Sequence, residues 1–248
     1  EYGKENKYDD NIFFQKYSQM SRSQQGLAGA GEWETLRKLL PDFKDKRVLD
    51  LGCGYGWHCI YAMEHGASSV VGVDISHKML EVAKEKTHFP QVEYKCCAIE
   101  DVEFPEESFD VILSSLAFHY VADYEILVKK IYRILKSGGK LVFTVEHPVF
   151  TAYGTQDWYY NEKGEILHFP VDNYYYEGKR TAVFLGEKVT KFHRTLTTYL
   201  NTLLSNGFII NHIVEPQPPE NMMDIPGMQD EMRRPMMLIV SANKKVDR

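Results

Sequence analysis

The sequence lacks the features that would place it in a membrane, in a disulfide-rich scaffold or on a zinc ion. It has no run of about 20 uncharged apolar residues, the length that an α-helix needs to cross a bilayer, and its polar start shows no secretory signal. The four cysteines form no Cys-x-x-Cys pair and no cluster with zinc-ligand spacing. We therefore expect a cytoplasmic protein with reduced thiols, no membrane span and no bound metal.

An excess of positive charge is also lacking. The 248 residues include 29 Lys and Arg against 35 Asp and Glu, a formal net charge of −6. Nucleic-acid binding depends on clustered Lys and Arg that contact phosphates, so this balance argues against a nucleic-acid partner. Hydrophobic residues make up 44% and charged residues 26% of the chain, which is ordinary for a globular protein. The length fits one large domain, or one domain with an insertion.

What the sequence does contain is a regular alternation of apolar runs and amphipathic segments between residues 30 and 150. Apolar runs predict strands at 47–52, 69–75, 92–98, 109–116 and 140–146. The intervening segments predict helices at 57–65, 76–86 and 124–136, with Ser76 as an N-cap and Gly138 and Gly139 ending the last helix. This pattern indicates a doubly wound α/β fold, with a parallel sheet covered on both faces.

After Pro148 the alternation stops and an aromatic-rich segment begins. A helix at 195–205 and strands at 208–214 and 236–242 follow it, which completes a seven-stranded, mostly parallel sheet. We expect residues 149–194 to be an insertion after the fifth strand that caps the substrate, because ligands bind at strand ends in such sheets and tyrosines offer flat apolar faces. The alternative is a β-hairpin or subdomain that packs on its own aromatic residues. The loop 215–235, rich in Pro and Met, would close the pocket or bind a partner.

The strongest motif is a glycine loop after the first predicted strand, where residues 48–56 read Val-Leu-Asp-Leu-Gly-Cys-Gly-Tyr-Gly. The Gly-x-Gly-x-Gly spacing differs from the Gly-x-Gly-x-x-Gly that is typical of dinucleotide binding. Asp50 precedes the first glycine, where a carboxylate would repel a pyrophosphate and attract an ammonium group. Asp74 ends the second strand, 22 residues after Gly52, where a carboxylate accepts hydrogen bonds from ribose hydroxyls. The expected ligand is a nucleoside with a cationic tail.

Four segments together carry a family resemblance. Residues 48–56 (VLDLGCGYG), 72–76 (GVDIS), 108–121 (SFDVILSSLAFHYV) and 135–148 (LKSGGKLVFTVEHP) resemble class I S-adenosylmethionine-dependent methyltransferases, in particular the small-molecule group that includes quinone-biosynthesis enzymes. The resemblance covers residues 30–148. It implies a Rossmann-like fold, S-adenosylmethionine as cofactor, S-adenosylhomocysteine as product and a small-molecule methyl acceptor.

The resemblance also implies cofactor contacts at the matched positions. The residues concerned are Asp50, Gly52, Cys53, Gly54, Gly56, Asp74, Ile75, Ile99, Glu100, Ser114 and Leu116. Asp50 would face the amino group of the methionine part, and Asp74 would hold the ribose. Many members of the family have Asp where this chain has Ala98, so either Glu100 or backbone groups would receive the adenine amino group.

In related enzymes a segment before the sheet folds over the cofactor. Residues 1–30 are therefore expected to form an N-terminal helical segment over the cofactor, and residues 31–248 the methyltransferase domain. Tyr17 and Arg22 are the candidate contacts in this segment, Arg22 for a carboxylate. Whether the protein is a monomer or a homodimer stays open.

Methyl transfer from a sulfonium is an in-line displacement, in which the enzyme mainly positions the reactants and excludes water. A base is needed only where the acceptor atom carries a proton of high pKa. The candidate bases are His119 and His147, which follow the fourth and fifth strands, and His193. We expect His147 to orient or deprotonate the acceptor, because the Glu146-His147-Pro148 turn holds it at a strand end.

Two other functions compete with this interpretation. A nicotinamide- or flavin-binding oxidoreductase would share the fold, but Asp50 and the glycine spacing argue against it. A noncatalytic protein that binds S-adenosylmethionine would share the pocket. Methylation of nucleic-acid bases is disfavoured by the charge and by the lack of an Asn-Pro-Pro-Tyr or Asp-Pro-Pro-Tyr stretch.

Overall fold

A seven-stranded sheet forms the centre of the protein, in a computed structural model that describes residue 4 and residues 6–246. Its strands are β1 (Arg47–Leu51), β2 (Ser69–Asp74), β3 (Val92–Cys96), β4 (Phe109–Ser115), β5 (Leu135–Glu146), β10 (Phe208–Val214) and β11 (Met237–Lys244). The strand order is β10-β11-β5-β4-β1-β2-β3. Neighbouring strands from β3 to β5 pair in parallel, whereas β11 runs antiparallel to both β5 and β10. The predicted seven-stranded, mostly parallel sheet is confirmed.

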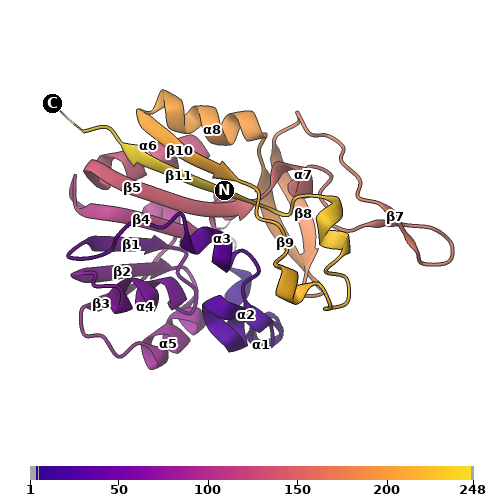
Figure 1. Ribbon diagram of the computed structural model, residues 1–248, viewed down its shortest axis with the longest axis horizontal. Helices are drawn as coiled ribbons and strands as arrows, with labels where there is room; N and C mark the ends of the chain where they lie inside the picture. The colour runs from indigo at the N-terminus through magenta and orange to yellow at the C-terminus, as the bar shows by residue number, and fades with distance from the viewer. Residues whose placement is uncertain (1–3, 5, 247–248) are drawn as a thin grey trace.

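Helices cover both faces of this sheet (Figure 1). Those on one face are α3 (Trp33–Arg37), α4 (Trp57–Glu64) and α5 (His77–Lys86), and those on the other are α6 (Tyr124–Ile134) and α8 (Leu196–Ser205). The sheet has a hydrophobic core on each face, and side chains of β1 point alternately into the two cores. Val48 packs toward α3, α4 and α5, whereas Leu49 and Leu51 pack toward α6 and α8. Within the described ranges, none of the helices has the length and apolar character needed to cross a membrane.

The helix boundaries follow the predicted caps in one case and not in another. Ser76 caps α5 as expected, because its hydroxyl accepts a hydrogen bond from the backbone N–H of Met79. The next predicted helix end is wrong: α6 stops at Ile134, and Gly138 and Gly139 lie inside β5. Leu135 is fully buried and already pairs with Phe109 of β4, so the chain turns to strand before the glycines. The glycines lie in the irregular stretch after this pair, where Gly138 takes a φ of 73°.

Between β5 and α8 the chain forms a short helix and two hairpins. These elements are α7 (Pro148–Thr151), the hairpin of β6 (Tyr159–Tyr160) with β7 (Ile166–His168), and the hairpin of β8 (Gly178–Phe184) with β9 (Glu187–His193). The β6–β7 hairpin extends away from the sheet (Figure 1). The loop before β11 is fixed to this region by Arg234, whose guanidinium lies 4.8 to 4.9 Å from the ring centres of Phe150, Trp158 and Phe169.

The N-terminal segment is helical and packs beside the carboxyl ends of the central strands. It comprises a 3-10 turn (Lys7–Asp9), α1 (Asn11–Ser18), α2 (Ser21–Gln25) and a second 3-10 turn (Gly26–Gly29). Asp9 accepts a hydrogen bond from the Ser76 hydroxyl at the start of α5, and Lys16 donates to the carbonyl of Leu185 in the β8–β9 hairpin. The segment therefore bridges the sheet domain and the insertion.

Candidate active site

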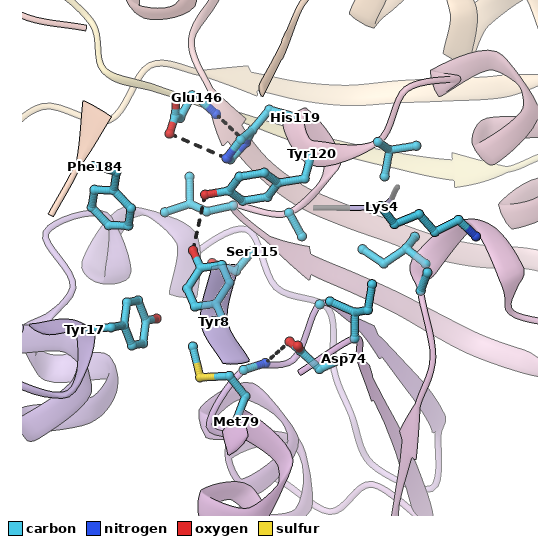
Figure 2. A pocket seen from close by; sticks show the side chains of 18 of the residues that line it. Lys4, Tyr8, Tyr17, Asp74, Met79, Ser115, His119, Tyr120, Glu146 and Phe184 are labelled. Carbon is cyan, nitrogen blue, oxygen red and sulfur yellow. Dashed lines mark hydrogen bonds and ion pairs between the residues drawn. The ribbon is translucent and has the colours of Figure 1, made fainter. Parts of the chain in front are cut away.

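A cavity lies where the parallel strands end, beneath the N-terminal segment and the β8–β9 hairpin (Figure 2). The residues that line it are Lys4, Tyr8, Tyr17, Met20, Arg22, Gly52, Gly54, Asp74, Ile75, Met79, Ala98, Ile99, Glu100, Ser115, Leu116, Ala117, His119, Tyr120, Val121, Glu146, Phe184, Met236 and Met237. We call the part around Asp74 and Ile99 the nucleoside end, and the part around Glu146 and His119 the acceptor end. The Tyr8–Tyr120 pair lies between the two ends.

The glycine loop after β1 forms the floor of the nucleoside end. The N–H groups of Gly52 and Cys53 both donate to the carbonyl of Val73, which folds the loop onto the end of β2. Gly52 has a φ of 77°, and a Cβ there would lie 2.5 Å from the Cβ of Ala117, so this position requires glycine. A Cβ at Gly54 would meet no atom within 4 Å, so its absence keeps space free at the cavity wall.

Asp74 is the carboxylate of the nucleoside end. Its two oxygens accept hydrogen bonds from the N–H of Gly54 at 2.8 Å and from the N–H of Ser76 at 2.9 Å. Burial raises the pKa of Asp74 despite these hydrogen bonds. An ionised carboxylate has about four acceptor positions, so both oxygens retain lone pairs for a ligand diol. Ile75, Ile99 and Leu116 supply apolar walls beside it.

Asp50 lies beneath the glycine loop and is absent from the wall of the cavity. Its carboxyl group is 1% exposed, and the thiol of Cys59 donates to it at 3.5 Å. Burial raises the pKa of Asp50 to about 7. The structure therefore does not bring Asp50 to a position where it would face a ligand ammonium directly, because the loop backbone intervenes.

Two other predicted cofactor residues also lie off the cavity wall. Gly56 precedes α4, and a Cβ there would lie 2.2 Å from the hydroxyl oxygen of Tyr94. Ser114 is buried and donates to the carbonyl of Leu51 at 2.7 Å, so it links β4 to β1. The next residue, Ser115, lines the cavity in its place. Successive side chains of a strand alternate between faces, which explains the displacement by one residue.

A smaller hollow adjoins the glycine loop on the side of the N-terminal segment. Five residues line both this hollow and the main cavity: Tyr17, Arg22, Gly52, Gly54 and Ser115. Cys53 lines the hollow but not the main cavity. The guanidinium of Arg22 donates to the buried carboxylate of Glu32, at 3.1 and 3.2 Å. Trp57 also lines this hollow, and its indole Nε1 is buried with no hydrogen-bond partner within the described part of the chain. This end therefore holds unused donor capacity.

The acceptor end contains a buried polar cluster, which we call the acceptor cluster: His119, Glu146, Gln156 and Lys191. The carboxylate of Glu146 receives hydrogen bonds from the Lys191 ammonium and the Gln156 amide, and its Oε1 lies 3.5 Å from Nε2 of His119. Lys191 also donates to the Gln156 carbonyl oxygen at 2.8 Å. Glu146 and His119 line the cavity, whereas Lys191 and Gln156 lie behind them.

The cluster differs from the nucleoside end in its electrostatics. Burial alone would raise the pKa of Glu146, but the nearby His119 ring, the positive charge of Lys191 and the hydrogen bonds from Lys191 and Gln156 lower it. Burial lowers the pKa of His119 to about 4, so its ring is neutral at pH 7. Its Nδ1 faces the backbone N–H of Glu146 at 3.4 Å, which places the ring proton on Nε2, toward the Glu146 carboxylate.

Aromatic side chains separate the two ends of the cavity. The hydroxyls of Tyr8 and Tyr120 lie 3.2 Å apart, and Tyr17 packs edge-on against Tyr8. Burial raises the pKa of Tyr8 well above its ordinary value, so it remains a neutral phenol. Phe184 of β8 completes the wall opposite Tyr8 (Figure 2).

The other two predicted histidines are held away from the cavity wall. His147 accepts a hydrogen bond from the N–H of Val149, which caps α7, and its Nε2 lies 2.7 Å from the Glu215 carboxylate. His193 is buried between the hydroxyl of Thr151, at 2.7 Å, and the carbonyl of Tyr174, at 2.8 Å. Of the three candidate histidines, His119 alone lines the cavity in the described structure.

The structure also reveals residues at the site that sequence reasoning missed. Glu146 directly precedes His147 at the same strand end, and Glu146 lines the cavity whereas His147 does not. Tyr8 comes from the N-terminal segment, and Lys191 and Gln156 from the insertion. None of these three belongs to a motif, and only the chain fold brings them to Glu146.

Comparisons with known proteins agree with this architecture. The Methyltransferase domain family matches residues 49–143. A crystal structure assigned as an S-adenosylmethionine-dependent methyltransferase from Listeria monocytogenes is 58% identical, covers 89% of this chain and 99% of its own, and superposes with a TM-score of 0.85. The S-adenosylmethionine-dependent methyltransferase from Mesorhizobium loti is 40% identical over 88% of this chain and 100% of its own, with a TM-score of 0.82.

A curated relative matches a little less than half of the chain. The ubiquinone biosynthesis O-methyltransferase of Coxiella burnetii is 36% identical over 44% of this chain and 47% of its own length. The full-length likeness to the two solved structures extends the match to the rest of the fold. The match to the methyltransferase domain family and the 58% and 40% identity to these two solved structures show that the chain is an enzyme of the S-adenosylmethionine-dependent methyltransferase family.

Proposed function

We propose that the protein transfers a methyl group from S-adenosylmethionine to a small-molecule acceptor by in-line displacement. The observation that carries this proposal is the continuity of the cavity. One end presents Asp74 and apolar walls, the other end presents Glu146 and His119, and a narrow aromatic section lies between them. A methyl donor and an acceptor placed in the two ends would meet at the Tyr8–Tyr120 pair.

The residues of the nucleoside end fit the cofactor. Asp74 would accept hydrogen bonds from the ribose hydroxyls, Ile75 and Ile99 would pack on adenine, and Glu100 or its neighbours' backbone would receive the adenine amino group. Bound S-adenosylmethionine supplies a methyl group that is activated because a neutral thioether leaves. Leu116 and Ser115 line the middle of the cavity, where that group would lie.

The methionine part fits the smaller hollow. Arg22 and the unpartnered Trp57 indole N–H would hold a carboxylate there, and Glu32 would face an ammonium group. Gly52, Cys53 and Gly54 would leave backbone groups close to the ligand. Asp50 would act from below the loop through its charge rather than by contact.

The N-terminal segment and the insertion are proposed to close the site. Tyr8, Tyr17 and Met20 from residues 1–30 and Phe184 from residues 149–194 line the cavity, which supports a roof that excludes water. A cavity covered in this way suits a small molecule rather than a polymer. Figure 1 shows the N-terminal helices and the β8–β9 hairpin on the same side of the sheet.

Among the three candidate histidines we retain His119 as the one that would touch the acceptor. Its low pKa and the hydrogen bond to Nδ1 make it a hydrogen-bond donor rather than a base. In this proposal it positions the Glu146 carboxylate and the acceptor. His147 and His193 would act as structural residues.

Calorimetry with S-adenosylmethionine, S-adenosylhomocysteine and NADH, followed by an acceptor screen with a labelled methyl group, tests the proposal. We expect both adenosyl compounds to bind with micromolar affinity and NADH not to bind. Label should then appear in a small organic product. Binding without any transfer across broad acceptor classes would favour a noncatalytic cofactor-binding protein, and tight NADH binding would favour an oxidoreductase.

A further inference from the structure

We propose, resting on the function above, that the methyl acceptor is a small amine and that the Glu146 carboxylate binds its nitrogen. The observation behind this assignment is the wall of the acceptor end. Its charged side chain is Glu146, and the remaining residues there are His119, Tyr120, Val121, Phe184, Met236 and Met237. An acceptor in this end would meet one carboxylate within an otherwise apolar and aromatic surface.

The carboxylate is held in place from behind. Lys191 and Gln156 both donate to Glu146 from the insertion, and His119 approaches Oε1 from the 3-10 turn after β4. Glu146 is 8% exposed and Lys191 3% exposed, so the ion pair is almost removed from water. Two hydrogen-bond donors, Lys191 and Gln156, use two of the roughly four acceptor positions of the carboxylate, which leaves acceptor capacity for a ligand N–H.

The nearby cations do not face the cavity. The guanidinium of Arg194 donates to the backbone carbonyls of Phe118, Val121 and Ala122, and neither Arg194 nor Lys191 belongs to the cavity wall. Lys191 therefore keeps Glu146 ionised from the protein side. At this wall an acceptor would meet the Glu146 carboxylate directly, whereas the Lys191 ammonium lies off the cavity wall.

The charge movement of amine methylation matches this arrangement. The nitrogen lone pair forms the new N–C bond while the C–S bond breaks and its electron pair goes to sulfur, so the positive charge moves from sulfur to nitrogen. The product is an ammonium ion that keeps its proton until it leaves. A fixed carboxylate beside the nitrogen stabilises this developing charge, and electrostatic stabilisation of this type is worth about 10²- to 10³-fold in rate.

Methylation of a hydroxyl or a carbon acid fits the cluster less well. Either reaction releases a proton and needs a base whose pKa lies near the working pH. The pKa of Glu146 is lowered, the pKa of His119 is about 4, and the Nδ1 lone pair of His119 already accepts the N–H of Glu146. An amine that is protonated in solution must first release one proton to water. The neutral amine then needs no base in the site, because its lone pair is free to form the N–C bond.

The test compares acceptors that share a shape and differ in one polar group. The probes have a benzyl, phenethyl or naphthylmethyl group, and each is used as the amine, the alcohol and the carboxylate. Calorimetry with protein saturated with S-adenosylhomocysteine measures binding, and a labelled methyl group measures transfer. We expect amines to bind at least about tenfold more tightly than the matched alcohols, because only the amine pairs its positive charge with the buried Glu146 carboxylate. We also expect the amines to receive the label.

Three variants separate this role from a structural one. Glu146→Gln should remove the preference for amines and lower transfer about 100-fold, while the affinity for S-adenosylhomocysteine stays within about twofold. Because Glu146→Gln leaves Lys191 buried without a counter-ion, the double variant Glu146→Gln/Lys191→Met is measured beside it and should behave alike. Glu103→Gln, an exposed carboxylate paired with Lys130 and Arg133 outside the cavity, is the charge-matched control and should keep the preference.

Each outcome decides the question. Alcohols or carboxylates that bind as tightly as amines, amines that do not bind at all, or a preference that survives in folded Glu146→Gln protein would overturn the assignment. If S-adenosylhomocysteine binds and the label enters hydroxyl or carboxyl acceptors instead, the amine proposal fails while methyl transfer stands. If neither adenosyl compound binds, the proposed function itself fails.

Discussion

At the nucleoside end of the cavity the wall comes from the loops after β1, β2 and β3, between residues 52 and 100, and the backbone N–H groups of Gly54 and Ser76 hold the Asp74 carboxylate. At the acceptor end the wall comes from side chains of the β4 and β5 ends and the insertion, and a buried side-chain network holds it. The first kind of wall is specified by local sequence. The second depends on where distant segments meet.

The carboxylates at the two ends also differ in their titration. Asp50 and Asp74 have raised pKa values because they are buried without a cation beside them. Glu146 is equally buried, yet its pKa is lowered because Lys191 and Gln156 donate to it. A buried carboxyl group therefore has a raised pKa at Asp50 and Asp74, and a lowered pKa at Glu146, where Lys191 and Gln156 donate to it.

The largest expected effect comes from this difference in titration. Asp50 has a pKa of about 7 in the folded protein against an ordinary 3.8, so the folded state binds more protons between these values. The free energy of unfolding should fall by about 4 kcal/mol from this group as the pH rises from 4 to 7. Asp50→Asn should flatten that fall in urea unfolding series.

The acceptor end should show the opposite slope. The folded pKa of His119 is about 4 against an ordinary 6.5, so the unfolded state binds the extra proton and its stabilising contribution is lost as the pH falls from 6.5 to 4. His119→Gln should remove this loss. Identical pH profiles for the wild type and both variants would show that neither group is buried as described.

The next largest effect concerns cofactor affinity. Asp74→Asn removes a charged acceptor while keeping the shape, and should weaken S-adenosylhomocysteine binding about 100-fold in calorimetry. Asp110→Asn at the other end of β4, where Asp110 accepts the N–H of Arg47, is the control and should change the affinity less than about twofold. An Asp74→Asn protein with unchanged affinity would remove Asp74 from the proposed site.

A smaller effect is expected from the steric fit of the glycine loop. Gly52→Ala forces a Cβ to within 2.5 Å of Ala117 at a φ of 77°, and should lower the free energy of unfolding by about 2 kcal/mol. Gly164→Ala has a similar φ of 79° but meets no atom within 4 Å, so it should cost about 1 kcal/mol. Equal losses would mean that conformational strain alone, and not contact with Ala117, requires glycine in the loop.

The smallest effect is expected at His147. His147→Ala removes the N-cap of α7 and should cost about 1 kcal/mol in thermal unfolding, while kcat for the acceptor found by the screen changes less than about twofold. A large loss of kcat in protein of normal stability would instead return His147 to the role of a base.

These contrasts explain what sequence reasoning reached. The strand and helix alternation, the Ser76 cap and the Gly52 turn are local, and the structure agrees with each of them. Choices between adjacent residues were less secure: Ser115 lines the cavity rather than Ser114, and Glu146 rather than His147. A shift of one residue reverses the face of a strand, and the end of an apolar run does not show where the last side chain points.

The position of Asp50, the end of α6 and the acceptor cluster could not be predicted from local sequence, because each depends on contacts between distant segments. The depth of Asp50 beneath its loop depends on how α4 packs, and the early end of α6 depends on the pairing of Leu135 with Phe109. The acceptor cluster joins residues 119, 146, 156 and 191, none of which carries a recognisable spacing. Tertiary packing decided all of these.

The contacts of the N-terminal segment have a consequence for synthesis on the ribosome. Residues 7–29 leave the ribosome before their partners at Ser76, Tyr120 and Leu185, which lie later in the chain. The helices of this segment therefore gain their full set of partners only after the β8–β9 hairpin has left the exit tunnel. The wall of the cavity is completed at the same stage, because Phe184 belongs to that hairpin.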